Sequence, residues 1–195
     1  MRWQARPCPP GPPGLFENYR GTPLTPELSR APRPGRSYER ITREDLVRLA
    51  GIARSDREDL FARKPRYRAL DGCLICVALC QGAALHYLDG KNGVKDFDVW
   101  TFFAAHPETP AFPWRRRRAV DFGDPRFGPS PDKPGFAGRH VDLLGRSLDV
   151  TEDADATAAL RKYLSEGHTE TARRLAEKAV VLLEPSDRLG AVIWP

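Results

Sequence analysis

The chain has 195 residues, of which 41% are hydrophobic and 29% are charged, and its formal net charge is +5. These values are typical of a soluble globular protein with one sizeable core. The opening residues, MRWQARPCPPGPPG, lack the apolar segment of a secretory signal, and no stretch of about 18 apolar residues predicts a membrane span. We therefore expect a cytoplasmic protein with reduced thiols.

Residues 1–36 contain nine of the 19 prolines and show no apolar periodicity. This composition predicts an extended, Pro-rich N-terminal arm. The pattern changes after it, where apolar residues begin to recur at regular spacing. We therefore divide the chain into the arm and a single domain over residues 37–195.

The first half of this domain predicts helices and then strands. Thr42, followed three residues later by Asp45, has the spacing of a capping box and starts a predicted helix. Apolar runs between turn residues predict strands, and β-branched and aromatic residues favour the same state. The predicted elements are helices over 43–54 and 56–63, a buried strand over 73–80, a short helix over 83–89, a turn at 90–93 and a strand over 94–103.

The second half begins with a long irregular segment over 104–138, which contains a short candidate strand at RRRRAVDF. A third main strand over 138–150 follows, then helices over 151–167 and 169–183, and a terminal strand over 189–195. The order of elements predicts an α+β domain with a small mixed sheet flanked by helices.

The run VKDFDVWTFF places two carboxylates inside an apolar strand. Asp96 and Asp98 point to the same face of such a strand, while Phe97 and Val99 point to the other. Two like charges this close repel each other unless a cation lies between them, and hard divalent cations prefer carboxylate oxygens. Asp142, flanked by apolar residues in RHVDLL, is the best candidate for a third carboxylate on a neighbouring strand.

A glycine turn precedes the acidic pair. The apolar strand ends at Gly82, a small residue and a short helix follow, and twelve residues separate Ala83 from Asp96. A glycine at a helix N-terminus lets backbone N–H groups approach a phosphate. Residues 70–150 thus resemble the polymerase-β-like nucleotidyltransferase superfamily, whose signature is an apolar residue, Gly and Gly or Ser, a spacer, an acid–apolar–acid–apolar run, and a later third acid.

The resemblance implies a nucleotidyltransferase-like core that moves a nucleoside monophosphate from an NTP to a hydroxyl of an RNA or a small molecule. Asp96, Asp98 and Asp142 would be the catalytic carboxylates and would bind Mg²⁺ or Mn²⁺. Basic residues near this site are candidates for contacts with phosphate. The expected nucleotide-binding residues are Gly82, Ala83, Lys95, Arg115, Arg117 and Arg139.

Two alternatives remain open from the sequence. Ala83 stands where the family has serine or a second glycine, so the chain could be a catalytically inactive member that binds nucleotide, RNA or a protein partner. Cys73, Cys76 and Cys80 could instead form a zinc module. Because CLICVALC is a solid apolar run, we expect these cysteines to be buried free thiols. His86 is expected to be structural.

Overall fold

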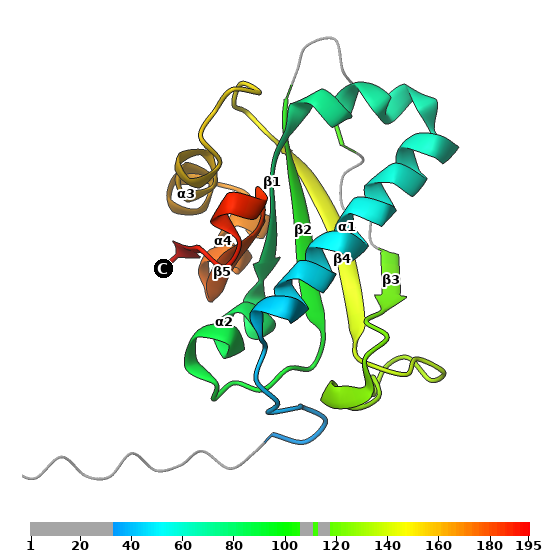
Figure 1. Ribbon diagram of the computed structural model, residues 1–195. Coiled ribbons are helices and arrows are strands. Elements are labelled where there is room, and N and C mark those ends of the chain that lie inside the picture. Colours follow the sequence, from blue (N-terminus) through cyan, green and yellow to red (C-terminus); the bar gives the residue numbers. More distant parts are fainter. Residues whose placement is uncertain (1–32, 106–110, 113–117) are drawn as a thin grey trace, which may run out of the picture. The chain divides into compact units, whose positions relative to one another are not determined.

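A six-stranded mixed sheet lies at the centre of the fold, with the strand order β3-β4-β2-β1-β5-β6 (Figure 1). The computed structural model describes residues 33–105, 111–112 and 118–195, so nearly all of the predicted arm lies outside the described residues. The strands β2 and β4 are parallel, and the other neighbours are antiparallel. The strands are β1 (Leu74–Cys80), β2 (Phe97–Ala104), β3 (Arg118–Asp121), β4 (His140–Leu148), β5 (Ala179–Glu184) and β6 (Val192–Trp194). The predicted α+β class with a mixed sheet is confirmed.

One face of the sheet is covered by α1 (Arg43–Arg63) and by the first turn of α2 (Gln81–Asp89) (Figure 1). Leu46, Leu49 and Ala53 of α1 are buried with alternate residues of the central strands. The predicted capping box is present, since Thr42 accepts from the N–H of Asp45 while Asp45 accepts from the N–H of Thr42. It satisfies two N–H groups that the helix leaves without partners.

The opposite face packs against α3 (Ala156–Glu166) and α4 (Glu170–Ala176). Leu160 of α3 and Leu175 of α4 are buried against the other set of alternating strand residues, which includes Phe102 and Leu182. Two layers of helices thus enclose the sheet and fix which strand residues point to which side. Among the described residues, no helix is long and apolar enough to cross a membrane.

The two predicted helices at 43–54 and 56–63 form one continuous helix, α1, so the predicted break at Ser55 is wrong. Both halves bury apolar residues, Leu49 in the large cluster beneath α1 and Leu60 in a smaller cluster that includes Phe103 of β2. A single serine destabilises a helix by only a few tenths of a kcal/mol. The burial of these leucines contributes more than that, so the helix continues through Ser55.

The predicted helix over 169–183 is also wrong in its second half. Its start is confirmed, because Thr169 caps α4 by accepting from the N–H of Ala172. The helix ends at Ala176, and AVVLLE forms the strand β5, in which every residue is buried. A short apolar run has no period that distinguishes a buried strand from a buried helix. The third helix also starts later than predicted, with Asp155 as its N-cap.

A buried ion pair ties α1 to the sheet. Arg57 donates to Glu184 of β5 at 2.7 Å, and each residue is only 8% exposed. Arg54 donates to the other oxygen of Glu184 at 3.0 Å, but its side chain is 57% exposed. The single carboxylate of Glu184 thus pairs with one buried and one solvated guanidinium.

We predict that Glu184→Ala lowers the free energy of unfolding by about 3 kcal/mol, because it leaves the Arg57 charge buried without a counter-ion. Arg54→Ala is the matched control and should cost less than about 1 kcal/mol, since that pair is screened by solvent. Urea denaturation of both variants measures the difference. Equal costs would contradict a special role for the buried pair.

Candidate functional site

The pairing of β2 with β4 brings two predicted site residues opposite each other. In this parallel register Asp98 is the Cα partner of Asp142, and Phe97 is the partner of Val141. Phe97 and Val141 lie in the core beneath α1. Since strand residues alternate between faces, both aspartates point to the other side of the sheet, where α4 lies.

Asp96 lies one residue before the start of β2 and contributes to a second grouping. Its Oδ2 is 3.5 Å from Nε2 of His140, and Oδ2 of Asp142 is 3.7 Å from the same nitrogen. One ligand atom from each of the three residues lies within 4.8 Å of the others, and such a group could hold a metal ion. His140 and Asp142 are each 2% exposed, whereas Asp96 is accessible from solvent.

A buried serine fixes the far side of the His140 ring. The Oγ of Ser130 lies 2.7 Å from Nδ1 of His140, and both side chains are buried. Ser130 belongs to the segment between β3 and β4. The imidazole is therefore held between a hydroxyl on one nitrogen and two carboxylates near the other.

The segment that carries Ser130 is fastened at its base by Asp121. This carboxylate accepts from the backbone N–H groups of Gly123, Ala137 and Gly138. Burial raises the pKa of Asp121, but the three hydrogen bonds outweigh it, so its pKa lies below the ordinary value. One side chain thus joins both ends of the connection between β3 and β4.

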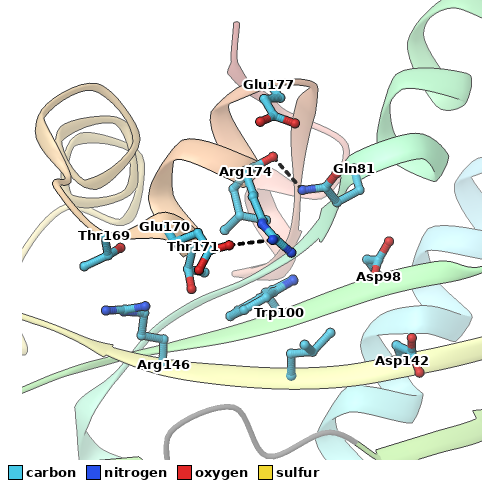
Figure 2. Close-up of a pocket in the computed structure, with 12 residues that line it drawn as sticks. Gln81, Asp98, Trp100, Asp142, Arg146, Thr169, Glu170, Thr171, Arg174 and Glu177 are labelled. Atoms are coloured by element: carbon cyan, nitrogen blue, oxygen red, sulfur yellow. Dashed lines mark hydrogen bonds and ion pairs between the residues drawn. The ribbon is translucent and has the colours of Figure 1, made fainter.

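A cleft of about 700 Å³ opens beside Asp98 and Asp142, between the sheet and α4 (Figure 2). Asp98 and Trp100 from β2 and Asp142 and Arg146 from β4 lie along the sheet side, as Figure 2 shows. The opposite wall comes from the first turn of α2 and from α4. Its labelled residues are Gln81, Thr169, Glu170, Thr171, Arg174 and Glu177.

The glycine turn lies at the start of α2, directly after β1. A Cβ atom at Gly82 would lie 3.6 Å from Nη1 of Arg36, which is ordinary van der Waals contact. Ala83 is buried in the core on the α1 side of the sheet. Gln81 instead lines the cleft, and its side chain donates to the backbone carbonyl of Arg174.

The basic residues predicted from the sequence lie in different places. Lys95 is exposed and forms an ion pair with Asp132 at 2.7 Å, and this hydrogen bond raises the pKa of Lys95. Arg139 is buried and donates to the backbone carbonyls of Phe127 and Gly35 at 2.8 Å. Arg115 and Arg117 lie outside the described residues.

Arg118, the last arginine of the predicted basic run, is turned away from the cleft. Its guanidinium pairs with Asp56 and Asp59 of α1, each at 3.0 Å. The cations that line the cleft are Arg146 and Arg174, which the sequence analysis did not select. Arg146 lies between Gly145 and Ser147 in β4, and Arg174 follows Arg173 in α4, so only the fold brings the two cleft arginines together.

The three predicted core cysteines are free and buried. Cys76 and Cys80 lie in the apolar cluster beneath α3 and α4, and burial raises the pKa of the Cys76 thiol to about 12. The metal-binding group found in the described part of the chain contains no cysteine. These thiols therefore behave as small apolar side chains, as expected.

His86 and His140 have opposite roles. His86 is structural, because its Nδ1 accepts from the N–H of Gly93, while Nε2 lies 3.0 Å from the carbonyl of Glu39. His140 is not among the site residues predicted from the sequence. The signal available was its position two residues before Asp142 on a strand, which places both side chains on one face.

No known family model, curated protein or solved structure matches this chain. The assignment of function therefore depends on the chemistry of the site.

We predict that the backbone amide shifts of Gly123, Ala137 and Gly138 report the titration of Asp121 at a midpoint below the ordinary pKa of about 3.9. Because the pKa is lowered by folding, its stabilising contribution is complete above the ordinary value and disappears as pH falls through the folded pKa. Two-dimensional NMR during acid titration measures the midpoint. Asp121→Asn should abolish this transition, and a midpoint at or above the ordinary value would contradict the assignment.

Proposed function

We propose that this protein is a metal-dependent nucleotidyltransferase that moves a nucleoside monophosphate from an NTP to an acceptor hydroxyl. The observation that carries the proposal is the position of Asp142, which groups with Asp96 and His140 on one side and lies opposite Asp98 beside an open cleft on the other. The three aspartates are the residues that the resemblance to polymerase-β-like nucleotidyltransferases implies. The acceptor is a hydroxyl of an RNA or a small molecule.

The residues present fit a divalent cation. Asp96 and Asp142 supply carboxylate oxygens and His140 supplies a ring nitrogen, all within 4.8 Å of one another. Asp98, as the Cα partner of Asp142, supports a second ion on the cleft side. Oxygen ligands suit Mg²⁺ and Mn²⁺. When bound, such ions neutralise the charge that develops on the phosphates during in-line transfer.

The cleft has a suitable size for a nucleotide, but its lining carries four carboxylates and two arginines, so a nucleotide would need divalent cations to bind there. Its volume of about 700 Å³ lies within the range of small-molecule sites. Arg146 and Arg174 would bind the phosphate chain, because guanidinium groups match phosphate geometry, although Arg174 would have to exchange its ion pair with Glu170 for the phosphate. Trp100, only 8% exposed, forms an apolar part of the wall.

Asp142 is the best placed general base. In the proposed reaction the acceptor oxygen forms a bond to the α-phosphorus while the bond to pyrophosphate breaks. The proton of the acceptor hydroxyl passes to the Asp142 carboxylate, which lines the cleft. Asp98 stands opposite on the neighbouring strand and would help to hold a divalent cation, which would supply positive charge for the phosphates. No covalent intermediate with the protein is required.

The alanine at position 83 suggests a second candidate, binding of nucleotide without turnover. The residue offers no hydroxyl to the terminal phosphates of a bound NTP. Measurements of nucleotide binding and of transfer on the same preparation separate the two candidates. Binding without transfer, in the presence of Mg²⁺ or Mn²⁺, would support the inactive form.

We predict that Asp142→Asn reduces nucleotide transfer at least about 100-fold, because it removes the general base. Asp98→Asn should also abolish most activity. Transfer of labelled nucleotide from each NTP to RNA and to small hydroxyl acceptors measures the effect. Asp153→Asn, which changes an aspartate in the turn before α3, is the control and should retain activity. Unchanged transfer by both site variants would overturn the proposal.

We predict that Arg146→Ala and Arg174→Ala each raise the KM for NTP roughly 10-fold, the loss of about one charged hydrogen bond. Arg173→Ala changes the preceding residue of α4, whose side chain does not line the cleft, and should leave KM unchanged. Steady-state kinetics with varied NTP measures the three variants. Equal KM values for all three would show that phosphates bind elsewhere.

A further inference from the structure

We propose that His140 is a metal ligand through Nε2, that Ser130 positions it, and that this nitrogen ligand gives the site a preference for a transition-metal ion over Mg²⁺. The inference rests on the metal site of the proposed function, but it does not depend on nucleotide transfer. The resemblance implies three aspartates as ligands, so a histidine in the group is a feature of this chain. It assigns a ligand, a positioning residue and a metal preference.

The distances around Nε2 fit a bound ion better than direct hydrogen bonds. The two carboxylate oxygens lie 3.5 and 3.7 Å from Nε2, beyond the usual hydrogen-bond range of about 2.7–3.2 Å. Metal–ligand bonds of about 2.1 Å place neighbouring ligand atoms roughly 3.0–3.4 Å apart. The three ligand atoms, which lie within 4.8 Å of one another, would have to move inward to complete the coordination.

The burial of the imidazole supports the same role. His140 is 2% exposed and is fixed at Nδ1 by Ser130, so its ring cannot turn away into solvent. Asp96 is the accessible member of the group and provides a route for entry. Two buried ligands and one accessible ligand form a pocket that an ion can reach from one side.

The hydroxyl of Ser130 suits both states of the site because it can donate or accept. Without metal, Nε2–H faces the carboxylates and Ser130 donates to Nδ1. When Nε2 binds an ion, its proton is absent and Nδ1–H donates to Ser130 instead. Ser130 thus holds the tautomer that presents a lone pair to the metal, as hydrogen-bonded partners of metal-binding histidines do.

The nitrogen ligand determines the preference among metals. Mg²⁺ takes oxygen ligands and gives up water reluctantly, whereas imidazole binds first-row transition metals well. An all-carboxylate site lacks this discrimination. His140 therefore raises the affinity for Mn²⁺ or Zn²⁺ relative to Mg²⁺, and loss of the ring should reduce that ratio.

The test is metal binding to the full chain without nucleotide. Titration calorimetry with Mn²⁺ and Mg²⁺ should give a lower Kd for Mn²⁺. His140→Gln should weaken Mn²⁺ binding at least 10-fold more than Mg²⁺ binding, and Ser130→Ala should weaken Mn²⁺ binding about 10- to 100-fold. Ser130→Thr keeps the hydroxyl and should restore affinity. Ser147→Ala, which removes a hydroxyl from the same β4 strand, should have no effect.

Two spectroscopic measurements make the result independent of folding defects in the variants. Electron spin echo spectra of the Mn²⁺-loaded wild-type protein should show coupling to a ring nitrogen. NMR of the ¹⁵N-labelled histidines should show His140 changing from the Nε2–H to the Nδ1–H tautomer when diamagnetic Zn²⁺ is added. Absence of nitrogen coupling, or equal loss of Mn²⁺ and Mg²⁺ affinity in His140→Gln, would overturn the inference.

Failure of this inference and failure of the proposed function give different results. If His140 is not a ligand, metal-dependent transfer can persist without nitrogen coupling. If the chain does not transfer nucleotide, the metal affinities and the tautomer change remain measurable.

Discussion

The parallel pairing of β2 with β4 is the constraint on which the site depends. It sets Asp98 opposite Asp142 at the spacing of neighbouring strands. Two carboxylates about 4.8 Å apart repel by roughly 3 kcal/mol at an effective dielectric constant near 20. The same register buries Phe97, Val99 and Val141 beneath α1. Each such side chain contributes roughly 1.5–3 kcal/mol when buried, so the core outweighs the repulsion. A shift of the β2 register by one residue would turn its apolar side chains toward the cleft and its aspartates toward the core.

The chain around this pair is assembled from segments that are far apart in the sequence. Arg139 donates to the backbone carbonyls of both Gly35 and Phe127 and so links two distant segments. Asp121 accepts from N–H groups at both ends of the β3–β4 connection. The same connection carries Ser130, whose hydroxyl contacts Nδ1 of His140. The carboxylates come from the sheet, but the orientation of the imidazole comes from a loop. Preorganisation of the site therefore depends on hydrogen bonds to backbone as much as on the apolar core.

Much of the fold was predictable because its signals are local. The capping box at Thr42, the apolar strand β1 and the alternation around Asp98 each depend on a few neighbouring residues. The errors occurred where local patterns carry two meanings. The first five residues of AVVLLE are apolar and show no period, so only its place between β1 and β6 makes the segment a strand. The location of Asp142 beside Asp98 followed from a family pattern, whereas the partnership of Ser130 with His140 depends on tertiary contact and has no sequence signature.

Ala83 stands where the resembled family has serine or a second glycine, and its position in the fold shows what this alanine does. Its side chain is buried in the core on the side of α1, so it supports packing between α2 and the sheet. The polar side chain that this turn offers to the cleft is Gln81, which adopts a positive φ of 62° and donates to the carbonyl of Arg174. Holding a non-glycine residue in that region costs about 1–3 kcal/mol, and such strain tends to occur at functional sites. In the proposed nucleotide complex, the contacts of this turn with phosphate would therefore come from Gln81 and the backbone rather than from a hydroxyl two residues later.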